Sequence, residues 1–151
     1  MKKLSLSLIL NLSALFIYAQ MADPTPAVSE AGSSTATLTV LVIDLGSDKG
    51  KLLTALYASE GEWLSKAYMG KISEIKDGAA TVTFSDVPYG SYAISTFHDE
   101  NDNGVLDAGL FKIPTEPYAS SRGAKGRFGP PKWKDAIFEV SQSELTESIK
   151  Y

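Results

Sequence analysis

Apolar residues recur at every second position along most of the chain from Ala36 onward, and turn-forming residues interrupt the pattern about every ten residues. A spacing of two is typical of β-strands with one buried face, whereas an amphipathic helix spaces its apolar residues by about 3.6. We therefore predict an all-β domain over residues 36–151 with few or no helices. The number of patterned segments predicts a β-sandwich of six to seven strands.

Two neighbouring segments open this domain. Residues 37–45 are rich in β-branched residues and apolar on both faces, which predicts a strand covered on both sides. The turn over residues 46–50 leads into residues 51–59, so the two strands are predicted to pair as a hairpin. Further strands are expected within residues 80–87, 91–99, 136–140 and 148–151. The predicted core consists of Leu38, Val40, Val42, Leu53, Tyr57, Val82, Phe84, Tyr92, Ile94 and Phe138.

The start of the chain has a different pattern. Two lysines precede an apolar run from Leu4 to Tyr18, and Ala19 offers a signal peptidase cleavage position. Residues 1–19 are predicted to be a signal peptide, so the protein is expected to be exported to the periplasm or the extracellular space. An uncleaved membrane anchor is the alternative, but the run is short for a membrane span and contains serines.

The segment that follows, residues 20–35, is rich in Pro, Ser, Ala and Gly and has no apolar periodicity. We predict a flexible linker there, with a short edge strand as the alternative.

Composition narrows the possible chemistry. The chain of 151 residues has 14 Lys and Arg, 18 Asp and Glu, one His and no Cys, and its formal net charge is −4. Without cysteines there is no disulfide, no cysteine zinc site and no thiol nucleophile. A net negative charge, which loss of the two signal-peptide lysines would increase, argues against nucleic acid as a partner.

One acidic loop carries distinctive residues. From Asp99 the sequence reads D-x-N-x-N-G-x-x-D, which spaces oxygen-bearing side chains at Asp99, Asn101, Asn103 and Asp107. Alternate residues of a tight loop can direct their oxygens at one centre, and the Val105 carbonyl adds a fifth donor. We predict calcium as a structural cofactor bound by these five residues.

The loop departs from an EF-hand at its last position. Leu110 stands where a bidentate glutamate is expected, so the site is either weaker or completed from elsewhere. Glu116 is the nearest downstream candidate, and Glu100 or Asp102 could turn inward instead. The alternative is a solvated acidic turn, since Asp and Asn favour turns for local hydrogen-bonding reasons.

At these motifs the chain resembles DUF2141, a bacterial family of small exported proteins of unknown function. The matching residues are Pro88, Gly90, Tyr92 and Ala93, then His98 to Asp107, then Ile113, Pro114 and Glu116, and finally Gly129, Pro130, Pro131 and Ala136. The resemblance implies an immunoglobulin-like or prealbumin-like β-sandwich with no established activity.

The remaining motifs suggest binding rather than catalysis. Five cations cluster between Arg122 and Lys134 with no acid among them, which favours either a solvated loop or a surface that recognises an anionic envelope polymer. Trp63 is predicted to be a hydrophobic plug or, alternatively, a recognition aromatic. We therefore expect a non-enzymatic module that binds an unknown envelope or extracellular protein or glycan. The alternative is a small secreted hydrolase that uses His98 with Ser95 and the acidic loop.

Overall fold

The computed structural model describes residues 34–127 and 129–151. The predicted signal peptide, residues 1–19, lies outside the described residues, as does the predicted linker up to residue 33. Thr35, the last residue of that linker, is the first residue of a strand. In the described part of the chain, no helix is long and apolar enough to cross a bilayer.

The described residues contain eight strands, more than the six to seven predicted, because two short strands carry no clear alternation. The strands are β1 (Thr35–Ile43), β2 (Lys51–Tyr57), β3 (Met69–Ser73), β4 (Ala80–Pro88), β5 (Gly90–Asp99), β6 (Tyr118–Ser120), β7 (Phe138–Val140) and β8 (Glu144–Lys150). Helical structure amounts to single turns, namely η1 (Glu60–Glu62), η2 (Leu110–Lys112), η3 (Ser121–Gly123) and α1 (Trp133–Ala136).

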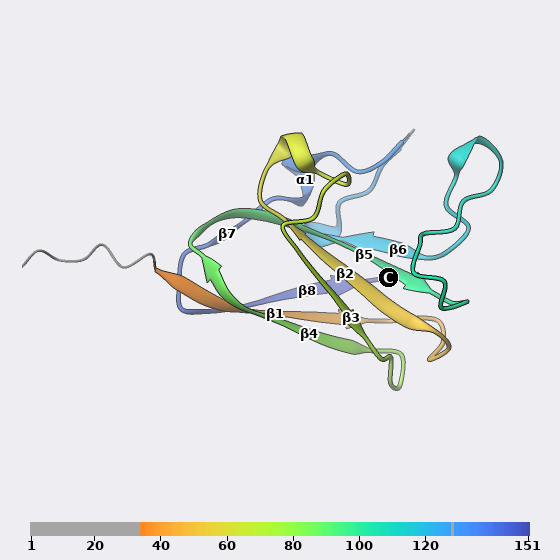
Figure 1. The fold of residues 1–151 in the computed structure, drawn as a ribbon, viewed down its shortest axis with the longest axis horizontal. Coiled ribbons are helices and arrows are strands. Elements are labelled where there is room, and N and C mark those ends of the chain that lie inside the picture. Colours follow the sequence, from red (N-terminus) through yellow and green to blue (C-terminus); the bar gives the residue numbers. More distant parts are fainter. Residues whose placement is uncertain (1–33, 128) are drawn as a thin grey trace, which may run out of the picture. The chain divides into compact units, whose positions relative to one another are not determined.

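The strands form two sheets, as Figure 1 shows. The first sheet has the order β4-β1-β8, in which β1 is antiparallel to β4 and parallel to β8. The second sheet has the order β3-β2-β5-β6, and β7 also pairs with β5. The all-β prediction with two sheets and few helices is confirmed.

Both sheets contribute alternate side chains to one hydrophobic core. Leu38 and Val40 of β1 are buried with Leu52 and Leu56 of β2 and with Ile94 of β5. Strands that bury every second side chain against a facing sheet form the inner layer of a sandwich. The two sheets therefore share one core.

The predicted hairpin between the first two strands is wrong, because β1 and β2 lie in different sheets. The turn over residues 46–50 crosses from one sheet to the other instead of reversing the chain within one. The prediction that the first strand is covered on both sides is also wrong, since burial alternates along β1 and Leu41 is 37% exposed on the outer face.

Leu53 is a third correction. It is only half-buried, whereas Leu52, Thr54 and Leu56 are buried and face the core. Two sets of largely apolar residues alternate in this strand, offset from each other by one position. A register shift of one residue would therefore exchange the buried set with the outer set. The other predicted core residues are buried, but Tyr57 lies outside the main core and lines the outer face of the second sheet.

A smaller hydrophobic cluster covers part of the outer face of the second sheet. Ala93 of β5 is buried there with Ala124 and Ala136, and the half-buried Trp63 and Trp133 pack against them. The Trp63 Nε1–H donates to the Pro131 carbonyl at 2.8 Å. Trp63 thus packs in a hydrophobic cluster, as the plug interpretation predicts.

Candidate functional site

The acidic loop follows directly from the end of β5 (Figure 1). Asp99, the last residue of the strand, is only 1% exposed, and its side chain turns into the loop. Its Oδ1 accepts a hydrogen bond from the Asn103 N–H at 3.1 Å and its Oδ2 accepts one from the Gly104 N–H at 2.7 Å. Burial by itself raises the pKa of Asp99, but hydrogen bonds from the backbone of the residues between Asn101 and Gly104 outweigh it and hold that pKa below its ordinary value.

The other predicted donors converge on Asp107. The Nδ2 groups of Asn101 and Asn103 donate to its two carboxylate oxygens at 2.6 Å and 3.1 Å. Asn101 Oδ1 accepts from the Asn103 N–H, and Asn103 Oδ1 accepts from the Val105 N–H. The side chains of Asp99, Asn101, Asn103 and Asp107 are therefore brought together, as the spacing predicts, while the Val105 side chain is exposed.

Glu116 holds the two ends of this loop together. Its Oε1 accepts from the Glu100 N–H and its Oε2 accepts from the Asp107 N–H, both at 3.0 Å. The residue is buried, and each of its carboxylate oxygens already has a backbone partner. Glu116 therefore positions the loop. The sequence offers this residue as a candidate for the terminal ligand.

Within the described residues, no group of three or more His, Cys, Asp or Glu side chains is arranged to hold a metal ion. A metal in the acidic loop would instead have the carboxylates of Asp99 and Asp107, the amides of Asn101 and Asn103 and a backbone carbonyl as donors. Such an all-oxygen set suits a hard cation such as calcium and suits zinc or copper poorly.

His98 is fully buried on the inner face of β5. Its Nε2 lies 2.6 Å from the Lys49 carbonyl oxygen, and because a carbonyl only accepts, Nε2 carries the proton. Ser95 is three residues away on the strand and therefore faces the opposite side of the sheet. His98 and Ser95 are not brought together, and His98 instead ties the turn before β2 to β5.

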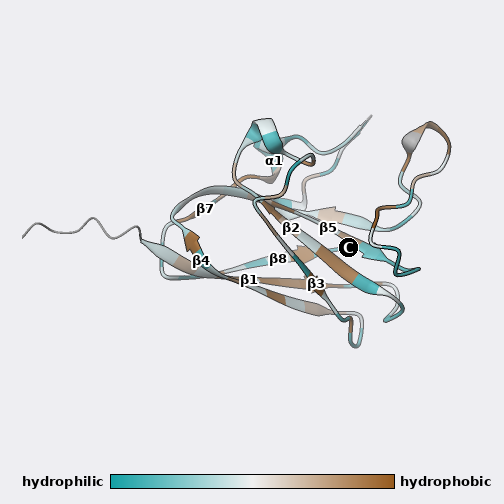
Figure 2. Cartoon of the chain, viewed as in Figure 1, coloured by the Kyte–Doolittle hydropathy of each residue, from teal (hydrophilic) through white to brown (hydrophobic). Residues whose placement is uncertain are grey.

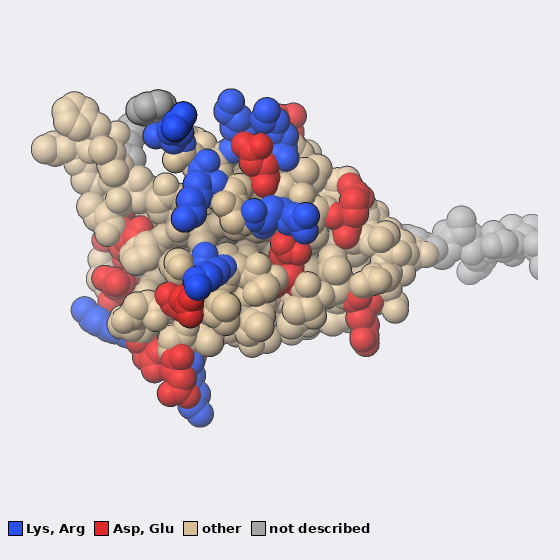
Figure 3. Space-filling view, turned by 180° about the vertical axis from the view of Figure 1, so that it is seen from behind, with Lys and Arg blue, Asp and Glu red and all other residues tan. Residues whose placement is uncertain are grey.

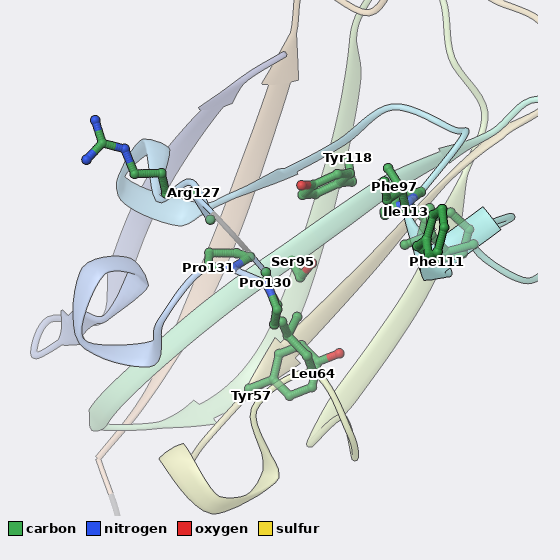
Figure 4. Close-up of a pocket in the computed structure, with 14 residues that line it drawn as sticks. Tyr57, Leu64, Ser95, Phe97, Phe111, Ile113, Tyr118, Arg127, Pro130 and Pro131 are labelled. Carbon is green, nitrogen blue, oxygen red and sulfur yellow. The ribbon is translucent and has the colours of Figure 1, made fainter. Parts of the chain in front are cut away.

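A cleft of about 990 Å³ lies on the outer face of the second sheet. Its floor includes Tyr57 of β2, Phe97 of β5 and Tyr118 of β6, and Phe97 and Tyr118 are paired across the strands. Figure 4 shows Ser95 near the middle of the cleft, between Tyr118 on one side and Tyr57 on the other. Burial raises the pKa of Tyr57, which keeps its hydroxyl protonated as a hydrogen-bond donor.

The walls of the cleft come from three loops. Leu64 follows η1, and a stretch of glycine and proline leads from Gly126 to Pro131. Phe111 and Ile113 belong to the third wall, which continues from the acidic loop. The described lining includes no carboxylate and no imidazole, and Arg127 is its charged residue. This cleft could not be predicted from the sequence, because its floor is assembled from separate strands.

Residues 108–114 form a projecting segment that we call the apolar arm. Leu110 is 85% exposed and Phe111 is 91% exposed at its tip. Figure 2 shows hydrophobic colours along this segment, which stands away from the sheets. The signal for the arm in the sequence is an apolar run that is too short for a strand and that follows a turn-rich loop.

Ser121 is a structural residue that sequence analysis missed. It is fully buried in η3, accepts a hydrogen bond from the Ile94 N–H at 2.9 Å and donates one to the Ala136 carbonyl at 2.6 Å. One hydroxyl therefore joins β5, η3 and α1 beside the cleft.

Comparison with known proteins gives one kind of match. The model of a family described as "Uncharacterized protein conserved in bacteria (DUF2141)" matches residues 40–148, a range that includes the acidic loop, the arm and the cleft. No match was found among curated proteins or among solved structures. The family match confirms the resemblance predicted from the motifs.

Proposed function

Because the chain belongs to the DUF2141 family of uncharacterized bacterial proteins, we propose a function from its own geometry, namely an exported, non-enzymatic module that binds an envelope or extracellular protein or glycan. The observation that carries this proposal is the aromatic cleft on the second sheet. Concave apolar sites with a few polar groups are the usual form of a ligand site. The hydroxyls of Tyr57, Ser95 and Tyr118 supply those polar groups.

The proposed binding is tested with delipidated envelope fractions, which retain protein and glycan. Replacing Tyr118 by Ala removes part of the aromatic floor and should lower retention of the protein about tenfold. Tyr89→Ala is the matched control, because Tyr89 is 41% exposed against 42% for Tyr118 and lies outside the cleft. Equal retention of the two variants would refute the assignment of the cleft.

We also propose that the acidic loop binds calcium in a structural role. The amide groups of Asn101 and Asn103 that now donate hydrogen bonds to Asp107 can turn their oxygens toward a cation instead. The ion would then offset the loop's negative charge and fix the base of the apolar arm. With a dissociation constant of about 0.1 mM, about 1 mM calcium would stabilise the fold by roughly 1.4 kcal/mol.

Thermal unfolding in about 1 mM calcium and in chelator tests this loop. A rise of several degrees is expected, and it should disappear when Asp99 and Asp107 are both replaced by Asn. Asp48→Asn is the control, since Asp48 also accepts two backbone N–H bonds but lies in a different turn. No calcium-dependent shift in the unaltered protein would mean a plain acidic turn.

Export is the remaining part of the proposal. Its support is the signal-like pattern of residues 1–19, and its test is cell fractionation with mass spectrometry of the amino terminus. We also propose the immunoglobulin-like or prealbumin-like type of sandwich. The support is a tyrosine corner, in which the Tyr92 hydroxyl at the start of β5 donates to the Pro88 carbonyl at 2.9 Å.

A further inference from the structure

The tip of the apolar arm presents two large hydrophobic side chains side by side to solvent. Leu110 and Phe111 are almost fully exposed, and Ile113 is 63% exposed behind them. Single exposed hydrophobic residues are ordinary on protein surfaces, but adjacent ones at a projecting tip mark a site of interaction.

Backbone hydrogen bonds hold the arm in this form. The Gly109 N–H donates to the Ile113 carbonyl at 2.9 Å, and the Thr115 N–H donates to the Asp107 carbonyl at 2.8 Å. Phe111 has φ 64° and ψ 20°, a left-handed conformation that is uncommon for a bulky residue. The two tip side chains are therefore held outward before any partner arrives.

A loop rich in cations lies across the cleft from the arm. Arg127 lines the same cleft as Phe111 and Ile113, and Figure 4 shows its side chain directed outward. We call residues 122–134 the basic loop; its exposed cations are Arg122, Lys125, Arg127, Lys132 and Lys134. None of these five makes an ion pair within the described residues. Figure 3 shows several lysine and arginine side chains, with acidic side chains among them, along one edge of the domain.

We propose that the apolar arm and the basic loop dock the protein peripherally onto a bilayer that contains anionic lipid. Leu110 and Phe111 would enter the boundary between headgroups and acyl chains, while the cations pair with lipid phosphates. A convex tip suits a fluid phase that closes around it, whereas a folded partner would need a matching pocket. Cations without ion pairs on the other side of the cleft favour an anionic surface. The proposal names a lipid partner for the proposed binding module, but it requires neither a cleft ligand nor calcium.

Co-sedimentation with vesicles tests the proposal, using the purified protein as isolated from cells. The vesicles are phosphatidylcholine alone, or phosphatidylcholine with about 30% phosphatidylglycerol. Binding is expected to the anionic vesicles only and should weaken as salt is raised. The double variant Leu110→Ser, Phe111→Ser should bind at least about tenfold more weakly.

Two further variants separate the contributions. Replacing Arg122, Lys125 and Arg127 by Gln should weaken binding about fivefold for each charge removed. Ile72→Ser is the control for the arm, because Ile72 is also 63% exposed but lies on β3, and it should bind normally. Circular dichroism checks that every variant is folded.

The outcomes are decisive for the arm. Failure to bind anionic vesicles, or equal binding by the Leu110 and Phe111 double variant, overturns the proposal. A concentration-dependent dimer that this double variant abolishes, without vesicle binding, would assign the arm to a second copy of the chain and overturns it too. Tyr118→Ala should leave vesicle binding intact, so a failure of the cleft assignment is distinguishable from a failure here.

Discussion

Glu116 offers the sharpest test of how the acidic loop is held. Its buried carboxylate accepts the backbone N–H groups of Glu100 and Asp107, at the two ends of the loop. Glu116→Ala removes both bonds. A hydrogen bond to a charged group contributes about 1.5–3 kcal/mol, and water can reach part of the space that the side chain leaves. We expect the free energy of unfolding to fall by about 2–4 kcal/mol.

The assay is urea unfolding followed by tryptophan fluorescence from Trp63 and Trp133. With a slope of about 1.5 kcal/mol per molar urea, the midpoint should fall by about 1–3 M. The urea midpoint of Glu116→Gln should fall by roughly half as much, because its one amide oxygen can still accept one backbone N–H. A loss below about 0.5 kcal/mol for Glu116→Ala, which is the scale of an ordinary surface substitution, would refute the reasoning.

The same variants separate positioning from metal binding. If Glu116 only positions the loop, Glu116→Gln should keep part of any calcium-dependent stabilisation, whereas Asp99→Asn with Asp107→Asn should abolish it. Equal loss in both would place Glu116 among the ligands and contradict its assignment as a positioning residue.

Three further predictions concern single residues. Gly50→Ala should destabilise the fold severely, because its φ is +76° and a Cβ there would lie 1.9 Å from the Asp99 carbonyl oxygen, whereas Gly46→Ala, with nothing within 4 Å, should be tolerated; both are checked by thermal melting. Ser121→Ala should cost about 1–3 kcal/mol in urea unfolding, because a buried donor and acceptor both lose their partner; a cost as small as that of exposed Ser65→Ala would contradict this. The depressed pKa of Asp99 stabilises the fold above the ordinary carboxyl pKa of about 3.9, and this contribution is lost as pH falls through the lower folded value. Between about pH 5 and 2, the free energy of unfolding should therefore depend less on pH in Asp99→Asn than in the unaltered protein. Parallel curves of that free energy against pH would rule out this stabilising role of Asp99.

Features that depend on residues close together in the sequence could be predicted from the sequence. The side chains of Asp99, Asn101, Asn103 and Asp107 lie together because turn preferences act locally, whereas the convergence of their oxygens on one ion stays a prediction. The inward positions of β1, β4 and β5 also followed from spacing alone. Calcium itself stays a prediction.

Features that depend on the pairing of strands far apart in the sequence could not be predicted. The sequence from Thr37 to Tyr57 has the local appearance of a hairpin, and only the pairing of β1 with β4 and β8 shows that the turn changes sheets. Leu52 and Leu53 compete for the core with nearly equal hydrophobicity, so the facing sheet decides between them. The cleft could not be predicted, since Tyr57 and Tyr118 come to line the same cleft only after β2, β5 and β6 have paired.

The parallel pairing of β1 with β8 has a kinetic consequence. Leu38 pairs with Leu145 and Val42 with Ile149, so the central strand of the first sheet completes its hydrogen bonds with the strand farthest from it in the described sequence. Closing so long a loop is slow, and folds dominated by such contacts form over milliseconds to seconds. Until β8 arrives, β1 has an open edge that can pair with another chain. Refolding should therefore become concentration-dependent when β8 is weakened, which makes this strand the point at which folding and aggregation compete.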